Sequence, residues 1–392
     1  LLPYFNQLTA IGLPGLRKVD LDWGDYDNDG DLDLILIGEN GGYVTKVFRN
    51  NGDNSFTEQT GLSLTGFTWD GSVEWGDYNN DGYLDILVTG YTSSGFKTII
   101  YRNNGDNSFT ALSGLTLPGV GNSDARWADY DADGDLDFLV TGASSGTKIA
   151  KIFRNEGSDS FIEQTSIALT GIEDSSIAWC DYDLDGYQDI LMAGTIGTDN
   201  YVTKIYHNNG NNSFSEETEF NLPGVQQGAV AWGDYNNDSY PDILLTGQTA
   251  DNYWGVAKVY KNDNGGGFTE QTGIVLEGVT YNSAAWGDYD SDGDLDIVIT
   301  GQEYGYNYRT KIYRNNGDNT FTSQTAIVLA GTQSGTTAWV DFDNDQDLDL
   351  LIYGSYYSSG YLFTSALYEN IGASPNTAPV APENLQVTLG TG

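Results

Sequence analysis

Seven copies of one unit, each built around a tryptophan followed two residues later by an aspartate, limit the fold of this 392-residue chain more than any other feature. The pairs are Trp23/Asp25, Trp75/Asp77, Trp127/Asp129, Trp179/Asp181, Trp232/Asp234, Trp286/Asp288 and Trp339/Asp341. Consecutive aspartates of this set lie 52 to 54 residues apart. A period in this range is typical of a solenoid or a propeller.

Each unit lacks helical periodicity and contains four short runs of strand-forming residues, separated by clusters of Gly, Asn and Asp. In the second unit these runs are Ser72–Trp75, Leu84–Thr89, Lys97–Arg102 and the region Phe109–Leu117. Four strands per unit are typical of a propeller blade. The sequence therefore predicts an all-β, seven-bladed β-propeller over residues 1–370.

The two ends of the repeat region complement each other. The last unit stops after its third strand, at Ala366–Asn370, and the missing fourth run stands at the other end of the chain, at Tyr4–Leu13. We expect the N-terminal segment to form the outer strand of the seventh blade. This pairing would close the ring and leave no open sheet edge.

The composition changes after Asn370. Residues 371–382 are rich in Pro, Ala and Ser, as expected for a linker. The following run, Pro379–Thr388, resembles the opening strand of a fibronectin type III domain, so residues 383–392 are expected to begin a further fibronectin type III or Ig-like domain. The chain would then be a processed or excised piece of a longer protein, with further domains of the same polypeptide as partners.

Charge and hydrophobicity narrow the class of partner. With 56 Asp and Glu against 16 Lys and Arg, the formal charge is −40, which repels nucleic acids and anionic membranes. Hydrophobic residues make up 39% of the chain, which suffices for a folded core. No apolar stretch approaches the length of a membrane span, so no direct membrane insertion is expected. Cys180 is the single cysteine and occupies a position where other units carry Gly, Ala or Val. We therefore expect its side chain to be buried as a small residue.

A nine-residue loop of pattern D-x-[DN]-x-D-G-x-x-D lies between the first and second strand of every unit. Side-chain oxygens at positions 1, 3, 5 and 9, the backbone carbonyl of position 7 and a water molecule supply the six or seven oxygens that Ca²⁺ prefers. The predicted ligand residues are Asp25, Asp27, Asp29, Asp31, Asp33; Asp77, Asn79, Asp81, Tyr83, Asp85; Asp129, Asp131, Asp133, Asp135, Asp137; Asp181, Asp183, Asp185, Tyr187, Asp189; Asp234, Asn236, Asp238, Tyr240, Asp242; Asp288, Asp290, Asp292, Asp294, Asp296; and Asp341, Asp343, Asp345, Asp347, Asp349.

We expect about seven bound Ca²⁺ ions. Mg²⁺ fits less well because it requires a stricter octahedron. The alternative is a set of solvated acidic turns that bind nothing, but seven copies in register argue against it. Ser239 and Gln346 replace the glycine of position 6 in the fifth and seventh loops, and these two loops are expected to bind calcium more weakly.

The acidic loop inside a strand-rich repeat, followed by runs such as Leu34–Gly38, resembles the FG-GAP/VCBS repeat family, known from the integrin α-subunit N-terminal propeller and from bacterial surface proteins. An EF-hand is excluded because Leu36 stands where that motif needs a Glu and because the flanks are strands. The resemblance covers residues 4–370. It implies the seven-bladed fold and calcium in the loops, but not one shared function. We also expect a secreted or cell-surface protein of a bacterium.

The repeats differ most between their second and third strands, as at Gly38–Lys46, Gly142–Lys148, Gly247–Lys258 and Gly354–Ser365. These segments lie on the face opposite the calcium loops and are rich in aromatic residues. The candidate ligand-binding residues are Tyr91, Phe96, Tyr201, Tyr253, Trp254, Tyr304, Tyr306, Tyr308, Tyr356, Tyr357 and Tyr361. Exposed aromatic rings suit a glycan or a protein, although these rings could instead pack over their own loops.

We therefore predict a non-enzymatic binding or adhesion module. One alternative is a carbohydrate-active lyase or hydrolase, whose best candidate residues would be Asp20, Asp22, Glu74, Asp124 and Arg126 before the repeat tryptophans. The other is a passive spacer domain. His207, the single histidine, stands where other units carry a basic residue, so we interpret it as a substitute for that residue.

Overall fold

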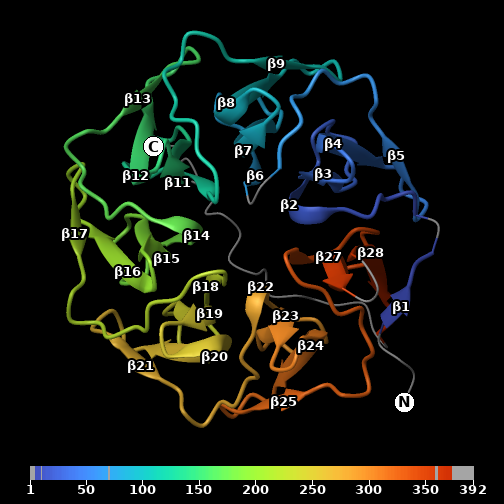
Figure 1. Ribbon diagram of the computed structural model, residues 1–392, viewed down its shortest axis with the longest axis vertical. Coiled ribbons are helices and arrows are strands. Elements are labelled where there is room, and N and C mark those ends of the chain that lie inside the picture. Colours follow the sequence, from blue (N-terminus) through green and yellow to red (C-terminus); the bar gives the residue numbers. More distant parts are fainter. Residues whose placement is uncertain (1–4, 10, 69–70, 358–360, 373–392) are drawn as a thin grey trace, which may run out of the picture.

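The chain forms a ring of seven four-stranded antiparallel sheets, as predicted (Figure 1). The computed structural model describes residues 5–9, 11–68, 71–357 and 361–372. None of these residues forms a helix, so the described chain has no helix that could cross a membrane. The expected linker beyond Gly372 and the fibronectin-like start at 383–392 lie outside the described residues.

Every blade has the same strand order, from the axis of the ring outwards. The inner strands are β2(Arg17–Gly24), β6(Val73–Gly76), β10(Ala125–Ala128), β14(Glu173–Cys180), β18(Val230–Gly233), β22(Thr280–Gly287) and β26(Thr337–Val340). The second strands are β3(Asp33–Glu39), β7(Asp85–Thr92), β11(Asp137–Ser144), β15(Asp189–Gly197), β19(Asp242–Thr249), β23(Asp296–Glu303) and β27(Asp349–Tyr357). The third strands are β4(Tyr43–Asn50), β8(Gly95–Asn103), β12(Thr147–Asn155), β16(Asn200–Asn208), β20(Asn252–Asn262), β24(Asn307–Asn315) and β28(Tyr361–Asn370). The outer strands are β5(Phe56–Glu58), β9(Phe109–Ala111), β13(Phe161–Glu163), β17(Phe214–Glu216), β21(Phe268–Glu270), β25(Phe321–Ser323) and β1(Phe5–Gln7).

The ring closes through the N-terminal strand, which confirms the predicted closure. β1 pairs antiparallel with β28, with Phe5 opposite Asn370 and Gln7 opposite Tyr368. Phe5 is buried between blades, with its ring 6.0 Å from that of Tyr289 and 6.1 Å from that of Trp339. The seventh blade is therefore built from both ends of the described chain.

The strand lengths differ from the predicted ones in two places. The fourth strand of the second unit covers only Phe109–Ala111, whereas a strand region up to Leu117 was expected, because the chain leaves the sheet there to reach the next blade. The second and third strands are longer than expected and continue pairing almost to the turn, as in Tyr91 opposite Phe96. The divergent segments between the second and third strands are consequently tight hairpins rather than loops.

The repeat tryptophans pack between neighbouring blades. Trp75 stacks on Tyr26 of the preceding blade at 5.8 Å between ring centroids, and Trp286 stacks on Tyr235 at 6.1 Å. In four blades the residue after the tryptophan is a glycine, because the next tryptophan lies against it: a Cβ on Gly76 would come within 2.6 Å of Trp127. Cys180 occupies this position in the fourth blade and is partly rather than fully buried; burial raises the pKa of its thiol to about 12.

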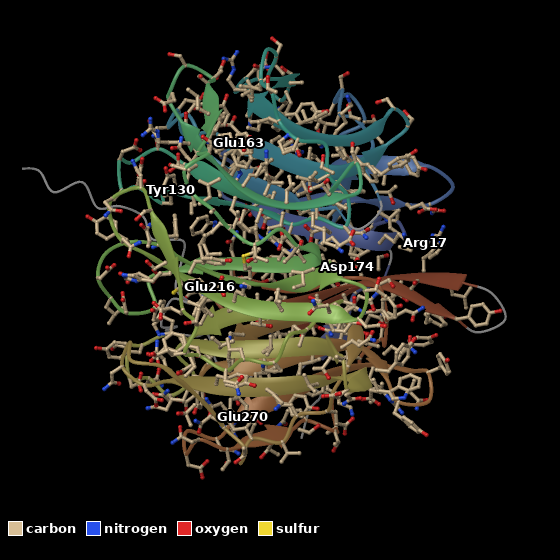
Figure 2. All side chains as sticks on the ribbon, turned by 60° about the vertical axis from the view of Figure 1, so that its left-hand side comes forward. Arg17, Tyr130, Glu163, Asp174, Glu216 and Glu270 are labelled. Carbon is tan, nitrogen blue, oxygen red and sulfur yellow. The ribbon has the colours of Figure 1, made fainter. Side chains whose placement is uncertain are left out.

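The ring has two distinct faces. Each inner strand runs into an acidic loop, so all seven loops lie on one face, together with the turns that follow the third strands. The hairpins between second and third strands lie on the opposite face. Figure 2 shows the ring from the side, with Tyr130 of the third acidic loop toward the left and Arg17 and Asp174, near the starts of inner strands, toward the right.

Candidate calcium loops and ligand face

The first aspartate of each acidic loop organises the backbone of that loop. In the first loop, the two carboxylate oxygens of Asp25 accept hydrogen bonds from the amides of Asp29 and Gly30, both at 3.0 Å. The corresponding pair of bonds is present in all seven loops, at 2.7 to 3.1 Å. The aspartate at position 5 likewise accepts a bond from the amide of position 7 in every loop.

The aspartate at position 9 is fully buried and is held by a residue that the sequence analysis missed. Asp33 accepts a 2.8 Å hydrogen bond from the amide of Asn50, the last residue of the third strand. The Asn50 side chain donates to the carbonyls of Leu32 in its own loop and Phe342 in the preceding blade. An asparagine makes the same contacts in all seven blades, and we call these residues the clamp asparagines; they are Asn50, Asn103, Asn155, Asn208, Asn262, Asn315 and Asn370.

The clamp asparagines were visible in the sequence as a constant Asn at the end of each third strand, directly before or near the Gly-containing turn. Their amide nitrogen and carbonyl oxygen are both used, because the side-chain oxygen accepts from the turn that follows, as in Asn50 and Gly52 at 3.1 Å. Each clamp therefore joins an acidic loop, its own turn and the neighbouring blade.

The predicted ligand side chains converge within single loops. Ligand atoms of Asp25, Asp27 and Asp29 lie within 4.8 Å of one another, and so do those of Asp129, Asp131 and Asp137. These groups combine positions 1, 3 and 5 in one case and positions 1, 3 and 9 in the other. A single cation can therefore contact side chains from both ends of a loop.

Several of these oxygens are buried without a partner. The Oδ1 atoms of Asp27, Asp131, Asp290 and Asp343, all at position 3, are buried and accept no hydrogen bond from the described residues. An unpartnered buried carboxylate oxygen is costly unless a cation or a donor satisfies it. An oxygen-only donor set around these atoms fits Ca²⁺.

Burial changes the protonation of the loop aspartates. It raises the pKa of Asp33, Asp85, Asp137, Asp189 and Asp349 to about 8. The pKa of Asp296 rises to about 9 for the same reason. A bound divalent cation would oppose these shifts because it favours the charged carboxylate.

A basic residue before each clamp asparagine partly balances the loops, except in the seventh blade, where Glu369 stands. Arg314 Nε lies 2.6 Å from Asp290 Oδ2, and Lys261 Nζ lies 2.7 Å from Asp238 Oδ2. His207 takes this position in the fourth blade, as interpreted from the sequence, with its Nδ1 3.3 Å from Asp183 Oδ2.

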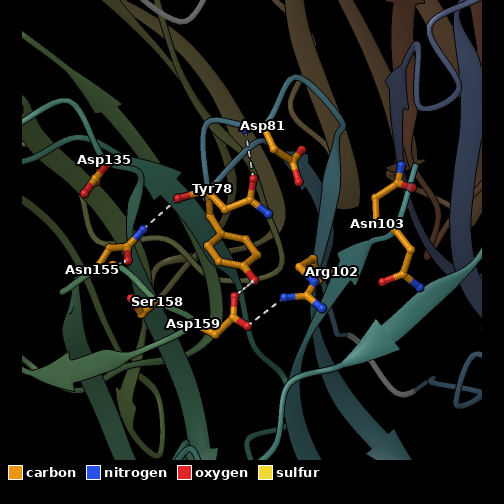
Figure 3. A pocket seen from close by; sticks show the side chains of 11 residues that line it. Tyr78, Asp81, Arg102, Asn103, Asp135, Asn155, Ser158 and Asp159 are labelled. Carbon is orange, nitrogen blue, oxygen red and sulfur yellow. Dashed lines mark hydrogen bonds and ion pairs between the residues drawn. The ribbon is translucent and has the colours of Figure 1, made fainter. Parts of the chain in front are cut away.

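The second blade makes a different contact, which opens a pocket. Its loop has Asn79 at position 3, and Arg102 instead pairs with Asp159 of the next blade at 2.9 Å (Figure 3). The Tyr78 hydroxyl donates to the other oxygen of Asp159 at 2.6 Å. The resulting polar pocket, of about 450 Å³, lies between the second and third blades on the face of the acidic loops.

Asparagines at position 4 join neighbouring loops along the rim. Asn28 donates to the carbonyl of Gly82 in the second loop at 2.8 Å, and Asn344 donates to Asp31 in the first loop at 2.9 Å. Asn80 and Asn237 make equivalent bonds to the third and sixth loops. The position is Ala132, Leu184 or Ser291 in the other blades.

Two of the loops carry a strained residue at position 6. Ser239 and Gln346 have φ angles of 75°, whereas the glycines at this position have φ angles of 87° to 96°. A left-handed conformation costs a residue with a side chain about 1–2 kcal/mol. We therefore expect Ser239→Gly and Gln346→Gly each to raise the free energy of unfolding by about 0.5–1 kcal/mol, after the extra entropy of glycine in the unfolded chain is deducted.

Chemical denaturation in saturating calcium measures this difference. The matched control is Gly134→Ser in the third loop, where a Cβ would meet no atom within 4 Å, so that only backbone strain changes. Gly134→Ser should lower the free energy of unfolding by about as much as Ser239→Gly and Gln346→Gly raise it. Equal stability of all three variants and the parent would contradict the assignment of strain.

On the opposite face, the candidate ligand residues form two clusters and several isolated positions. Trp254 lies edge-on to Tyr253, Tyr304 and Tyr306, with ring centroids 5.2 to 5.3 Å apart. We call these four residues the Trp254 cluster; they come from the hairpins of the fifth and sixth blades. Tyr304 and Tyr306 are 76% and 66% exposed, so these rings do not pack beneath their own hairpins.

A smaller cluster joins the first two blades. Tyr91 lies edge-on to Phe96 at 5.1 Å and to Tyr43, a residue that the sequence analysis did not single out, at 5.8 Å. Tyr201 accepts a hydrogen bond from Gln226 at 3.0 Å. Tyr308 and Tyr356 are partly buried on strands, Tyr357 is exposed, and the side chain of Tyr361 lies outside the described part.

The charged residues proposed as enzymatic candidates lie on the inner strands of the first three blades, except Asp124, which directly precedes β10. Their carboxylates accept hydrogen bonds from backbone amides of the next blade: Asp22 from Trp75 at 2.8 Å and Glu74 from Trp127 at 2.7 Å. Asp20 and Asp124 make equivalent bonds, and Arg126 pairs with Asp124 at 3.1 Å. Burial raises the pKa of Glu74 to about 8 and that of Asp20 and Asp22 to about 6.

Fold and loops together define a seven-bladed β-propeller with an acidic metal-type loop in every blade. The sequence profile described as FG-GAP-like repeat matches residues 25–88, 129–192, 181–245 and 288–352, which is more than half of the chain. The chain therefore belongs to the FG-GAP-like repeat family. Each match begins at the first aspartate of an acidic loop and ends in the second strand of the following blade.

Solved structures show distant similarity. AofleA from Arthrobotrys oligospora is 11% identical with a TM-score of 0.48, over 81% of this chain and 89% of that chain. A mutant of Aleuria aurantia lectin in complex with alpha-methyl-L-fucoside is 13% identical with a TM-score of 0.44, over 82% and 99%. A thermostable family-43 glycoside hydrolase is 11% identical with a TM-score of 0.36, over 66% and 94%. No curated protein matches the sequence.

Proposed function

We propose that this chain is a calcium-stabilised binding module, secreted or on the cell surface, that recognises a glycan through the face opposite the acidic loops. In this proposal the seven loops each hold one Ca²⁺ ion and serve stability, whereas recognition belongs to the aromatic hairpins. A protein ligand on the same face is the second candidate.

The loops support the calcium part of the proposal. Four loops contain a buried Oδ1 atom that accepts no hydrogen bond from the described residues, and each is surrounded by further carboxylates. A module with one cysteine forms no intrachain disulfide to stabilise it outside the cell, so a cation that binds only the folded loop would take that role.

The single observation that carries the recognition part is the Trp254 cluster. Four aromatic rings from two blades meet at one point of the face, and three of them are more than half exposed. Exposed tyrosine rings around a partly buried indole can stack against the apolar face of a sugar ring, and their hydroxyl groups can bond to those of the sugar.

The enzymatic alternative has less support. The carboxylates of Asp20, Asp22, Glu74 and Asp124 each accept a backbone hydrogen bond that joins two blades. These contacts give the four side chains a structural task at the ring axis, independent of any substrate.

We expect Trp254→Ala to weaken glycan binding roughly 5- to 13-fold, since stacking on one aromatic ring contributes about 1–1.5 kcal/mol. The melting temperature should change little, because the ring belongs to a hairpin and is only partly buried. A glycan array identifies the ligand, and calorimetry with that ligand measures the affinity. Phe96→Ala, which removes an exposed ring in the second blade, is the control and should bind normally.

Equal loss in the Phe96→Ala variant would move the site to another part of the face. If no glycan on the array binds, the glycan proposal is wrong. If a protein ligand binds the parent but not Trp254→Ala, recognition of a protein replaces it. A chain that binds neither would be a spacer.

A further inference from the structure

The fourth acidic loop differs from the other six because an imidazole, rather than an Arg, Lys or Glu side chain, faces its carboxylates. His207 Nδ1 lies 3.3 Å from Asp183 Oδ2 and 3.3 Å from Asp189 Oδ1. Its Nε2 lies 3.9 Å from Asp185 Oδ2. The three ligand atoms of His207, Asp183 and Asp189 all lie within 4.8 Å of one another.

These atoms converge without hydrogen bonds between them. His207 Nδ1 is buried and makes no hydrogen bond to any described residue, despite the two carboxylate oxygens beside it. Asp189 is fully buried and uses Oδ1 to accept one bond from the amide of Asn208 at 2.7 Å, which leaves a lone pair on that oxygen. Asp183 Oδ2 accepts no hydrogen bond among the described contacts.

We propose that the fourth loop binds a transition-metal ion of the zinc class through His207 Nδ1, Asp183 and Asp189. Ligands about 2.0–2.1 Å from a tetrahedral zinc ion are about 3.3–3.4 Å apart, which matches both distances from His207 Nδ1. An imidazole nitrogen selects Zn²⁺, Ni²⁺ or Cu²⁺ over Ca²⁺, which prefers oxygen ligands. Asp181 and Asp185, which belong to the same loop, have ligand atoms within 4.8 Å of one of Asp183 and are the nearest further carboxylates of that loop.

The other blades offer no nitrogen ligand at the position of His207, because five of them carry an Arg or a Lys and the seventh carries Glu369, whose carboxylate supplies only oxygen. Arg154 and Arg314 direct a guanidinium group at the position-3 aspartates of the third and sixth loops, and Lys261 directs an ammonium group at the fifth. These cations have no lone pair to donate to a metal. The seven loops, although alike in backbone, would therefore differ in metal preference.

Asp183 and Asp189 are also predicted calcium ligands, so zinc would displace calcium from the fourth loop alone. The zinc site does not depend on calcium binding in the other loops, so it can be tested separately from the proposed function. Asp183 also approaches the next blade, where a Cβ on Gly265 would lie 3.0 Å from the Asp183 Cβ, so this loop is in contact with the fifth blade.

Zinc analysis of the protein without a polyhistidine tag tests the proposal. After equilibration with zinc in about 1 mM calcium, the parent should retain roughly one zinc ion per chain. His207→Arg, which copies the residue of other blades, should lower zinc affinity by about 10- to 100-fold. The reverse exchange, Arg154→His, places an imidazole beside Asp131 and Asp137 and should add a second zinc ion.

Two further measurements distinguish a misfolded variant and zinc bound at another place from loss of the proposed site. Calcium stoichiometry and melting temperature of His207→Arg in calcium should match the parent, which shows that the variant is folded. Anomalous diffraction at the zinc edge should place the ion in the fourth loop. Equal zinc binding by the parent and His207→Arg, or zinc spread over all seven loops, would overturn the proposal, whereas loss of calcium binding throughout would overturn only the calcium proposal.

Discussion

Removal of calcium is expected to lower the melting temperature of this propeller by tens of degrees or to unfold it. In each loop, carboxylates about 4 Å apart repel by about 4 kcal/mol per pair at an effective dielectric constant near 20. Extracellular calcium modules have dissociation constants of about 0.1–1 mM, and a 100-fold excess adds about 2.7 kcal/mol per independent site. Several such sites exceed the usual net stability of a domain, about 5–15 kcal/mol.

Scanning calorimetry in excess chelator and in millimolar calcium measures this effect, and restored Ca²⁺ should reverse it better than Mg²⁺. Asp131→Asn tests one loop alone. The second loop naturally has Asn79 at this position, and Asp131 Oδ1 has no hydrogen bond to a described residue, so the substitution changes the charge of the loop with little other disturbance. It should be less stable than the parent in calcium. In chelator it should be equally or more stable, since one repelling charge is gone. Identical melting of the parent in both solutions would show that the loops bind no structural calcium.

Deletion of residues 1–13 is expected to open the ring, with a large loss of stability or aggregation. The deletion removes β1, the buried Phe5 ring between Tyr289 and Trp339, and the hydrogen bond from Leu8 to the carbonyl of Leu367 at 2.9 Å. It also exposes β28 as an unpaired edge, which can pair with another chain.

Thermal unfolding and analytical ultracentrifugation in calcium would measure the outcome. Truncation after Gly372 removes a comparable length that follows the last described strand, and it serves as the control. A peptide of residues 1–16 added in trans should restore part of the lost stability. Unchanged melting and a monomeric state after the N-terminal deletion would contradict closure by β1.

The sequence was sufficient for the blade number, the closure and the position of the acidic loops, because each depends on local patterns repeated seven times. The Trp/Asp pairs mark the end of every inner strand, and the surplus segment at Tyr4–Leu13 matches the missing outer strand. The glycine that follows the tryptophan in four blades, such as Gly76 against Trp127, belongs to the same repetition. Repetition converts a weak local preference into a strong signal.

Contacts between blades were harder to predict, because they depend on how adjacent sheets are placed. The bond from Asn50 to Phe342 joins residues at opposite ends of the sequence, although both belong to repeated positions. The Trp254 cluster depends on two hairpins whose lengths vary among blades, so no periodic pattern indicates that Tyr304 reaches Trp254. The same holds for His207, whose role follows from its distance to Asp189 and not from its residue type alone.

Closure by the N-terminal strand has a consequence for how such chains gain and lose blades. Because β1 completes the sheet of β26, β27 and β28, the sequence repeat and the structural blade are out of phase by one strand. Recombination between repeats in the interior of the gene adds or removes a whole period and preserves that offset, so β1 still meets the third strand of whichever blade comes last. A change in repeat number would therefore leave the pairing of the two chain ends intact, whereas loss of either end would leave the last blade incomplete.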